Sequence, residues 1–312
     1  MSNTWNGMTF TNIAQRGITT LRKALAPLQA FTTDFSTDVQ AQGTVVTTRI
    51  VPSATAPTDL VDDDSSTYTS VVDDQTTTAV TVTLDPHPIT GFALTDSEAQ
   101  NIGDGVWADT SMRLVDAHVY AIANEILAAS FDLVTNANYS TAAFVGSAST
   151  FDADDCADIR TTAVNAGWNM GDDSNTMVLQ PNYWASLLKD NAIQDRGASG
   201  ADALQSGDLP RLSGFKMIEA PTLPTASSTA ASENLVGFIA RPDAIAIAMR
   251  GVDTQDRSRF LHYEILQDDV TGAVMTYSVL WTEAKRRVEH IFEALYGVSK
   301  AQGASLKRIT SA

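Results

Sequence analysis

Apolar residues recur at helical spacing in two long segments of the chain. In the first, Thr11–Gln29, one stripe gathers Ile13, Ile18, Leu21, Leu25 and Leu28. In the second, Thr110–Ser130, one stripe gathers Val115, Val119, Ile122 and Ile126. This period of about 3.6 residues predicts two amphipathic helices, and the second would span roughly 30 Å. Gly17 and Pro27 weaken the first helix, which fits either an ordinary surface helix or an arm lying on a neighbouring subunit or an assembly partner.

Strands are predicted at Gly43–Val51 and at Ala79–Leu84, the second of which alternates Val80, Val82 and Leu84 with threonines. Between them lies Pro52–Asp74, which is rich in Ser, Thr, Asp and Pro and too long for a tight turn. The pair therefore predicts a long hairpin with a projecting tip at Ala54–Asp73. The acidic run Asp62–Asp64 lacks the spacing and the glycine of a calcium loop, so a solvated tip is favoured over a cation site.

From Thr95 onward, the sequence predicts a helix, then an α/β unit and then further strands. Thr95–Glu98 has the form of a capping box and predicts a helix start. From about residue 133 to 255, helices are predicted at Phe151–Ala166 and Asn182–Lys189, and strands at Met177–Leu179, Phe215–Glu219 and Leu235–Ala240. Returning strands are predicted at Arg259–Leu266, Ala273–Trp281 and Arg286–Leu295, ahead of a basic tail with Lys300, Lys307 and Arg308.

Composition narrows the class of protein. The 312 residues are 44% hydrophobic and 18% charged, which is typical of a globular chain long enough for two domains. The net charge is −17, and a protein that binds DNA by neutralising phosphates needs a basic face instead.

No stretch approaches the ~18–20 apolar residues of a membrane helix, and the N-terminus lacks a basic region followed by an apolar run. We therefore expect a protein that is made and used in the cytoplasm.

Catalytic motifs are missing from the sequence. It contains no phosphate loop, dinucleotide-binding glycine turn, His-Glu-Xaa-Xaa-His, paired cysteines or Gly-Xaa-Ser-Xaa-Gly. The four histidines, His87, His118, His262 and His290, fall on separate elements. Cys156 has neither a histidine neighbour nor metal-ligand spacing, and we expect it to be a small buried hydrophobe. The sequence thus predicts no enzyme and no catalytic, cofactor-binding or metal-binding residues.

Three phrases in the second half carry a family resemblance. They are Met177–Asp190 (MVLQPNYWASLLKD), Leu212–Pro221 (LSGFKMIEAP) and Leu235–Met249 (LVGFIARPDAIAIAM). Their order resembles the shell-forming domain of tailed-phage major capsid proteins, in which a strand leads into a Pro-opened helix, a second strand follows, and a third strand ends in an Arg-Pro-Xaa-Ala-Ile helix, here Arg241–Ile245. Ile89–Ala99 also resembles a junction in coat proteins of short-tailed phages.

This resemblance implies an α+β fold, the Hong-Kong-97-like major capsid fold that encapsulin shells share. It implies an N-terminal arm, an extended hairpin called the E-loop, a peripheral or P domain with the long spine helix, and an A domain that meets its copies at capsomer centres. The corresponding residues are 1–38 for the arm, 39–92 for the E-loop, 93–132 and 257–299 for the P domain, 133–256 for the A domain and 300–312 for a C-terminal tail.

The function implied is self-assembly into the icosahedral head shell of a tailed double-stranded DNA phage. The implied partners are its own copies in hexamers and pentamers, a scaffolding protein, a portal, the enclosed DNA and a possible decoration protein, with no membrane. The cross-linking lysine that some family members carry in the E-loop has no counterpart, since no lysine lies between Lys23 and Lys189. Two alternatives stay open: an encapsulin-type shell around protein cargo, and a β-rich surface or tail adhesin.

Overall fold

The computed structural model describes residues 10–50, 78–95, 98, 106–171, 174–194, 209, 211–252 and 257–312. The predicted hairpin tip, Ala54–Asp73, lies outside these residues. The predicted capping box is present, because the backbone N–H of Thr95 donates to Oε2 of Glu98 at 2.9 Å and the N–H of Glu98 donates to Oγ1 of Thr95 at 3.5 Å. The rest of the helix start after Thr95 falls mainly outside the described residues.

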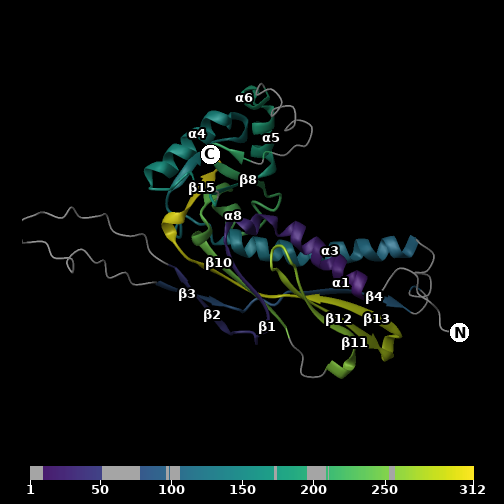
Figure 1. Cartoon of the computed structure of the whole chain (residues 1–312). Coiled ribbons are helices and arrows are strands. Elements are labelled where there is room, and N and C mark those ends of the chain that lie inside the picture. The colour runs from purple at the N-terminus through teal and green to yellow at the C-terminus, as the bar shows by residue number, and fades with distance from the viewer. Residues whose placement is uncertain are drawn as a thin grey trace, which may run out of the picture.

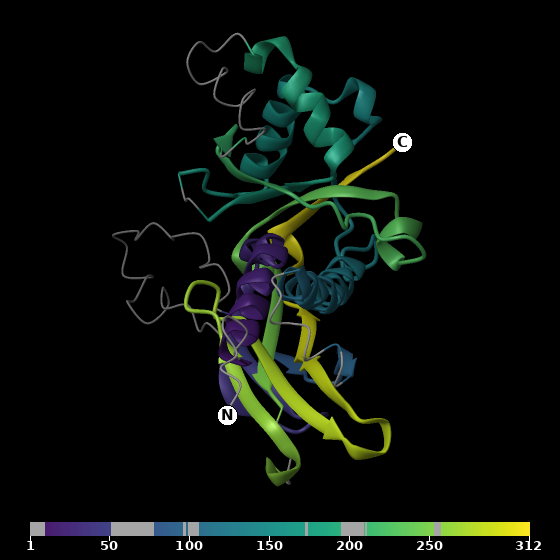
Figure 2. The ribbon, with the colours of Figure 1, turned by 90° about the vertical axis from the view of Figure 1, so that its right-hand side faces the viewer.

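Both predicted amphipathic helices form. Helix α3 spans Val106–Asp132, whereas α1 spans Phe10–Ala24 and ends before the predicted Gln29, where a 3-10 turn, η1 (Ala26–Ala30), follows. Every apolar residue of the two predicted stripes is buried. The first stripe packs within its own chain, because Ile13 and Leu21 share one core with Val119 of α3. The stripe itself is thus buried inside the subunit, and a contact of residues 1–38 with a neighbouring subunit stays a prediction. Helices α1 and α3 lie in the middle layer of the molecule, between its upper and lower halves (Figure 2).

A fully buried strand, β10 (Ile245–Gly251), runs beneath these helices. It pairs in parallel with β1 (Thr32–Val39) and antiparallel with β14 (Leu295–Lys300). This corrects the predicted helix at Arg241–Ile245, because only one 3-10 turn, η5 (Pro242–Ala244), forms before the strand. The alternation of Ile or Met with Ala along Ile245–Met249 has the period of a strand that is buried on both faces.

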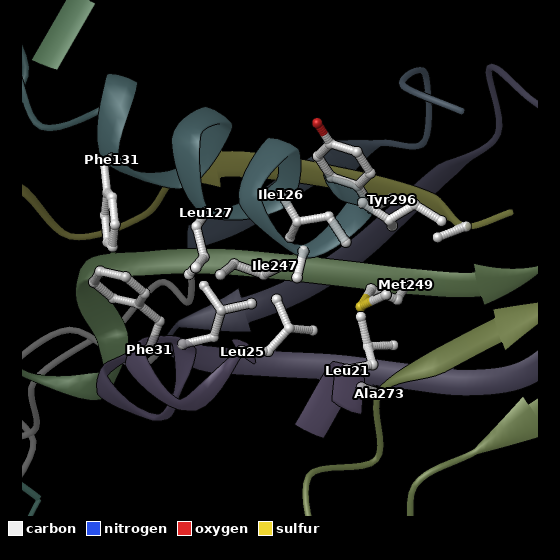
Figure 3. Close-up of a cluster of buried hydrophobic side chains, with 14 of the residues drawn as sticks. Leu21, Leu25, Phe31, Ile126, Leu127, Phe131, Ile247, Met249, Ala273 and Tyr296 are labelled. Atoms are coloured by element: carbon white, nitrogen blue, oxygen red, sulfur yellow. The ribbon is translucent and has the colours of Figure 1, made fainter. Parts of the chain in front are cut away.

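The two faces of β10 contact different layers. Ile247 and Met249 meet Leu21 of α1 and Ile126 of α3 in the main core (Figure 3). On the opposite face, Ala246 and Ala248 pack against the predicted hairpin, which forms from β2 (Val45–Ile50) and β3 (Thr78–Thr83). Strand β10 therefore joins the helical layer to the hairpin.

A four-stranded antiparallel sheet covers the other part of the helix pair. Its strands, in spatial order, are β11 (Phe260–Gln267), β12 (Val274–Thr282), β13 (Arg287–Glu293) and β4 (Ile89–Thr95). All three returning strands predicted from the sequence are confirmed within a residue or two. The hairpin β2–β3 and this sheet lie at opposite ends of the lower half of the molecule (Figure 1).

The upper half is a six-stranded sheet in the order β5-β15-β9-β6-β8-β7. Its strands are β5 (Ala142–Val145), β6 (Thr176–Leu179), β7 (Arg211–Leu212), β8 (Phe215–Glu219), β9 (Leu235–Ala240) and β15 (Leu306–Thr310). Helices α4 (Ala153–Asn165) and α5 (Pro181–Lys189) cover one face around a second apolar core. The opposite face meets the main core through Phe31, Phe131 and Phe238.

The C-terminal residues differ from the predicted tail. Strand β15 inserts between β5 and β9, and its five residues are all buried. Arg308 is held in place because its guanidinium group donates to the carbonyl oxygen of Tyr139, to Glu233 and to Asn136, at 2.8, 3.2 and 2.7 Å. The positive charge of Arg308 is therefore paired inside the fold rather than exposed to solvent.

Short helical turns complete the chain. They are η1 (Ala26–Ala30), η4 (Ala148–Thr150), α6 (Asn191–Gln194), α8 (Thr229–Ser232), η6 (Arg257–Arg259), η7 (Glu283–Lys285) and η8 (Gly303–Ser305). No helix among the described residues is long and apolar enough to cross a membrane.

The contact between the hairpin and β14 generates a prediction. A Cβ on Gly297 would lie 2.3 Å from the carbonyl oxygen of Thr83 and 2.8 Å from Cγ1 of Val82. Gly297→Ala should therefore push β3 away and lower the free energy of unfolding by about 1–3 kcal/mol. Gly303→Ala is the control. The atom nearest to the Cβ added there is Cε of the flexible Lys300 side chain, at 3.4 Å, so the urea unfolding of this variant should match that of the wild type. Equal stability of the two variants would contradict the close packing.

Candidate assembly surfaces

The hairpin β2–β3 has one buried and one open face. Val80 and Val82 point into the core shared with β10, while Val45 is 52% exposed. This difference follows from the period of two, which sends successive side chains to opposite faces of a strand. The base of the hairpin is thereby fixed to its own subunit, and its outer face is available for contact with another molecule.

Strands β5 and β7 are the two edges of the six-stranded sheet. An edge strand presents backbone donors and acceptors along its outer side, which can pair with another chain. Val145 at the β5 edge is 62% exposed, a large value for an apolar side chain in a strand. The upper half of the molecule therefore offers two separate surfaces for contact with another molecule.

Three of the four histidines come together in one stack of rings, which the sequence did not reveal. Phe92 stacks on His118 and on His290, with ring centroids 5.8 and 4.9 Å apart. The hydroxyl oxygen of Tyr277 lies 2.7 Å from Nδ1 of His290. The ring centroid of His262 lies 5.7 Å from that of Tyr277. The fourth histidine, His87, lies outside the stack and pairs with Glu293 at 3.0 Å.

The surroundings of these histidines indicate a packing role. The described residues hold no group of three or more His, Cys, Asp or Glu side chains that could bind a metal ion. His290 is buried under α1 and α3, and this burial lowers its pKa from 6.5 to about 4. The imidazole is therefore neutral at neutral pH and contributes ring contacts between the four-stranded sheet and the helices.

Cys156 is fully buried, as its sequence neighbours predicted. Burial, reinforced by Asp155, Asp152 and Asp190, raises the pKa of its thiol to about 12. Because the thiolate is the reactive form of cysteine, this side chain is inert at neutral pH. The acidic run Asp62–Asp64 lies outside the described residues, and its expected solvation stays a prediction.

Comparison with known proteins gives a structural match without a sequence match. No protein-family model and no curated protein matches the chain. A capsid structure of the cyanophage P-SCSP1u matches with a TM-score of 0.56 and 12% identity, over 91% of this chain and 86% of that one. A crystal structure of a virus-like particle from Pyrococcus furiosus matches with a TM-score of 0.54 and 12% identity, over 96% and 98% of the two chains.

A structure from Mycobacterium phage Che8 matches with a TM-score of 0.50 and 16% identity, over 99% of this chain and 93% of that one. This chain has the phage capsid fold. The α+β capsid fold that the three sequence phrases predicted is thereby confirmed, because the matches extend along almost the whole chain. At these identities the likeness establishes the capsid fold and assigns no role to individual residues.

The buried His290 generates a prediction about acid stability. Its pKa is about 4 in the folded chain and about 6.5 when unfolded, so the unfolded state binds the extra proton between these values. The contribution of His290 to the free energy of unfolding should be fully present above pH 6.5, and the free energy should fall by about 3 kcal/mol as the pH drops to 4. His290→Phe should remove this part of the pH dependence in urea unfolding of subunits.

Tyr277→Phe is the matched control. It removes the hydroxyl beside His290 but leaves the ring buried, and burial is the cause of the shift. This variant should therefore keep the acid-dependent loss of stability. If His290→Phe and the wild type lose stability in parallel between pH 6.5 and 4, the assignment to His290 is wrong.

Proposed function

We propose that this chain is the major capsid protein of a tailed double-stranded DNA phage, and that its copies assemble into the icosahedral head shell. The observation that carries this proposal is the match to the cyanophage P-SCSP1u capsid structure along 91% of the chain. The described residues present no metal-binding cluster, and the sequence contains no catalytic motif, which supports a structural role.

The charge of the chain suits enclosure of a genome. With a net charge of −17, the protein repels nucleic acid on average. A shell that encloses packed DNA without binding it can carry a net negative charge. A protein that recognises a DNA sequence needs a positively charged face instead. The DNA would therefore be a non-specifically enclosed partner rather than a bound ligand.

We assign the parts of the fold as follows. The hairpin β2–β3 with the segment between its strands is the E-loop, the four-stranded sheet with α3 is the P domain, and the six-stranded sheet with α4 and α5 is the A domain. The buried strand β15 belongs to the A domain, so we revise the tail at 300–312 accordingly. The partners are other copies in hexamers and pentamers, a scaffolding protein and a portal during assembly, and a decoration protein in some shells.

A second candidate is an encapsulin-type shell around protein cargo. The match to the Pyrococcus furiosus virus-like particle favours it, because it covers 98% of that chain at a TM-score of 0.54. Both candidates are closed shells of many copies of one chain. They differ in what the shell encloses and in the need for a portal.

Electron microscopy tests the proposal. The purified protein, alone or co-expressed with the other head proteins of its source, should form closed icosahedral shells. Large shells with a portal at one vertex support the phage head, and small shells filled with protein support the encapsulin-type alternative. Fibres or isolated trimers would contradict both and favour an adhesin, and a persistent monomer would contradict all three.

The shell should be held together without covalent bonds. No lysine lies between Lys23 and Lys189, which excludes an amine cross-link from the E-loop, and Cys156 is buried. Particles boiled in denaturant and reductant should therefore release one band at the chain mass of 33.3 kDa. A ladder of larger bands in the same gel would show that covalent cross-links form.

A further inference from the structure

The outer edge of β4 is exposed and uncharged. This strand is the last of the four-stranded sheet, next to β13. Its seven residues, ITGFALT, include no charged residue and no proline. Charged residues and prolines are common means by which a protein protects a sheet edge from pairing with another chain. Within the described part of the chain, β13 pairs with one side of β4 and no strand pairs with the other side.

The backbone groups of β4 divide into an inward and an outward set. Along an antiparallel strand, successive residues direct their N–H and C=O groups alternately toward and away from the neighbouring strand. The carbonyl oxygen of Pro88 accepts the N–H of Ala294, directly after β13, at 3.2 Å. The N–H of Thr95 instead donates to Oε2 of Glu98 at 2.9 Å. Both bonds indicate that even-numbered residues of β4 face β13 and that odd-numbered residues face outward.

Glu98 leaves three residues of the outward set open to pairing. It satisfies the N–H of Thr95 at the end of the strand. The other outward residues, Ile89, Gly91 and Ala93, are all exposed. Their outward N–H and C=O groups have no hydrogen-bond partner among the described residues. A groove runs along this part of the edge, so another extended strand could lie there and bond to the three residues.

The open part of the edge is complementary to itself. If two copies of β4 pair antiparallel about a twofold axis at Gly91, Ile89 of each copy stands opposite Ala93 of the other copy. This register pairs the three residues that have open backbone groups and leaves out Thr95. It also places a large side chain, which is 61% exposed in the single subunit, opposite a small one. Cross-strand contacts of this kind stabilise a sheet.

The surroundings of the edge favour a second copy as the occupant. A Cβ on Gly91 would lie 2.2 Å from the carbonyl oxygen of His290, so no side chain projects at the centre of the contact. Beside the groove, Arg287 and Glu289 of β13 form an ion pair at 2.6 Å and offset each other's charge. The net charge of −17 opposes the approach of two copies in general. An uncharged strand is a place where they can meet without like charges facing each other.

We propose that β4 of one copy of this chain pairs with β4 of a second copy, so that the two four-stranded sheets join into one continuous sheet. The same surface serves both copies, which produces a closed, symmetric pair. The inference goes beyond the proposed function, because the contact needs only two copies and no shell.

A pair of cysteines tests the contact and its register. In Ile89→Cys with Ala93→Cys, each new thiol faces a thiol of the other copy, at a Cα separation of about 5.5 Å that a disulfide accepts. Oxidation with diamide should therefore produce a band at twice the chain mass of 33.3 kDa on a non-reducing gel. Cys156 is buried and should not contribute.

Ile89→Cys with Thr95→Cys is the matched control. All of the substituted side chains in the two variants are exposed, but residue 95 faces no thiol in the proposed register, so little dimer should form. Equal amounts of dimer in the two variants would overturn the proposal. Absence of dimer in the first variant would overturn it too, because the edge would then be vacant or reserved for a different protein.

Charged substitutions at the same positions test the strength of the contact. Ile89→Lys with Ala93→Lys places like charges opposite each other, whereas Ile89→Lys with Ala93→Glu places opposite charges there. The dissociation constant of the dimer in sedimentation should be at least about tenfold higher for the first variant than for the second. Thermal melting should show that both are folded, because the two positions are exposed. Equal association of the two variants would contradict the contact.

Failure of this contact and failure of the proposed function give different results. If the wild type forms shells but the variant with cysteines at 89 and 93 gives no covalent dimer, either in shells or as free subunits, the strand contact fails and the proposed function stands. If that variant gives the dimer while the wild type forms no shell with the other head proteins, the strand contact stands and the proposed function fails.

Discussion

The burial of β10 on both faces is the constraint on which the rest of the fold depends. Ile247 and Met249 pack against α1 and α3, while Ala246 and Ala248 leave space for the hairpin on the other side. Large residues on one face and alanines on the other set how closely each layer can approach, because protein interiors are packed without gaps. The ion pair between Arg250 and Asp34, at 2.9 Å, ties the neighbouring strand β1 to the same strand. The hairpin can therefore project from the subunit while its base stays fixed.

Local periodicity was sufficient to predict much of this architecture. The two helical stripes and the alternation of Val80, Val82 and Leu84 depend only on spacing within each segment, and these apolar residues are buried as expected. The prediction failed at β10 for a local reason as well. The family resemblance implied a helix at Arg241–Ile245, yet the alternation of Ile and Ala that follows has the period of a strand.

Other features could not be predicted because they depend on contacts distant in sequence. Strand β15 is rich in polar residues, and Arg308 is buried only because Tyr139, Glu233 and Asn136 converge on it. The ring stack around His290 joins residues from β4, α3, β12 and β13, and no spacing within one segment indicates it.

The distribution of apolar residues has a consequence for assembly. Helix α1, the hairpin base and α3 all bury their apolar stripes within one subunit, so these stripes cannot drive association. The large apolar side chains that stay exposed lie scattered over separate elements, for example Val45 on the hairpin, Val145 on β5 and Leu261 on β11. Contacts through such scattered side chains are weak one by one. A shell of the proposed kind would therefore gain its stability from the number of contacts that each subunit makes.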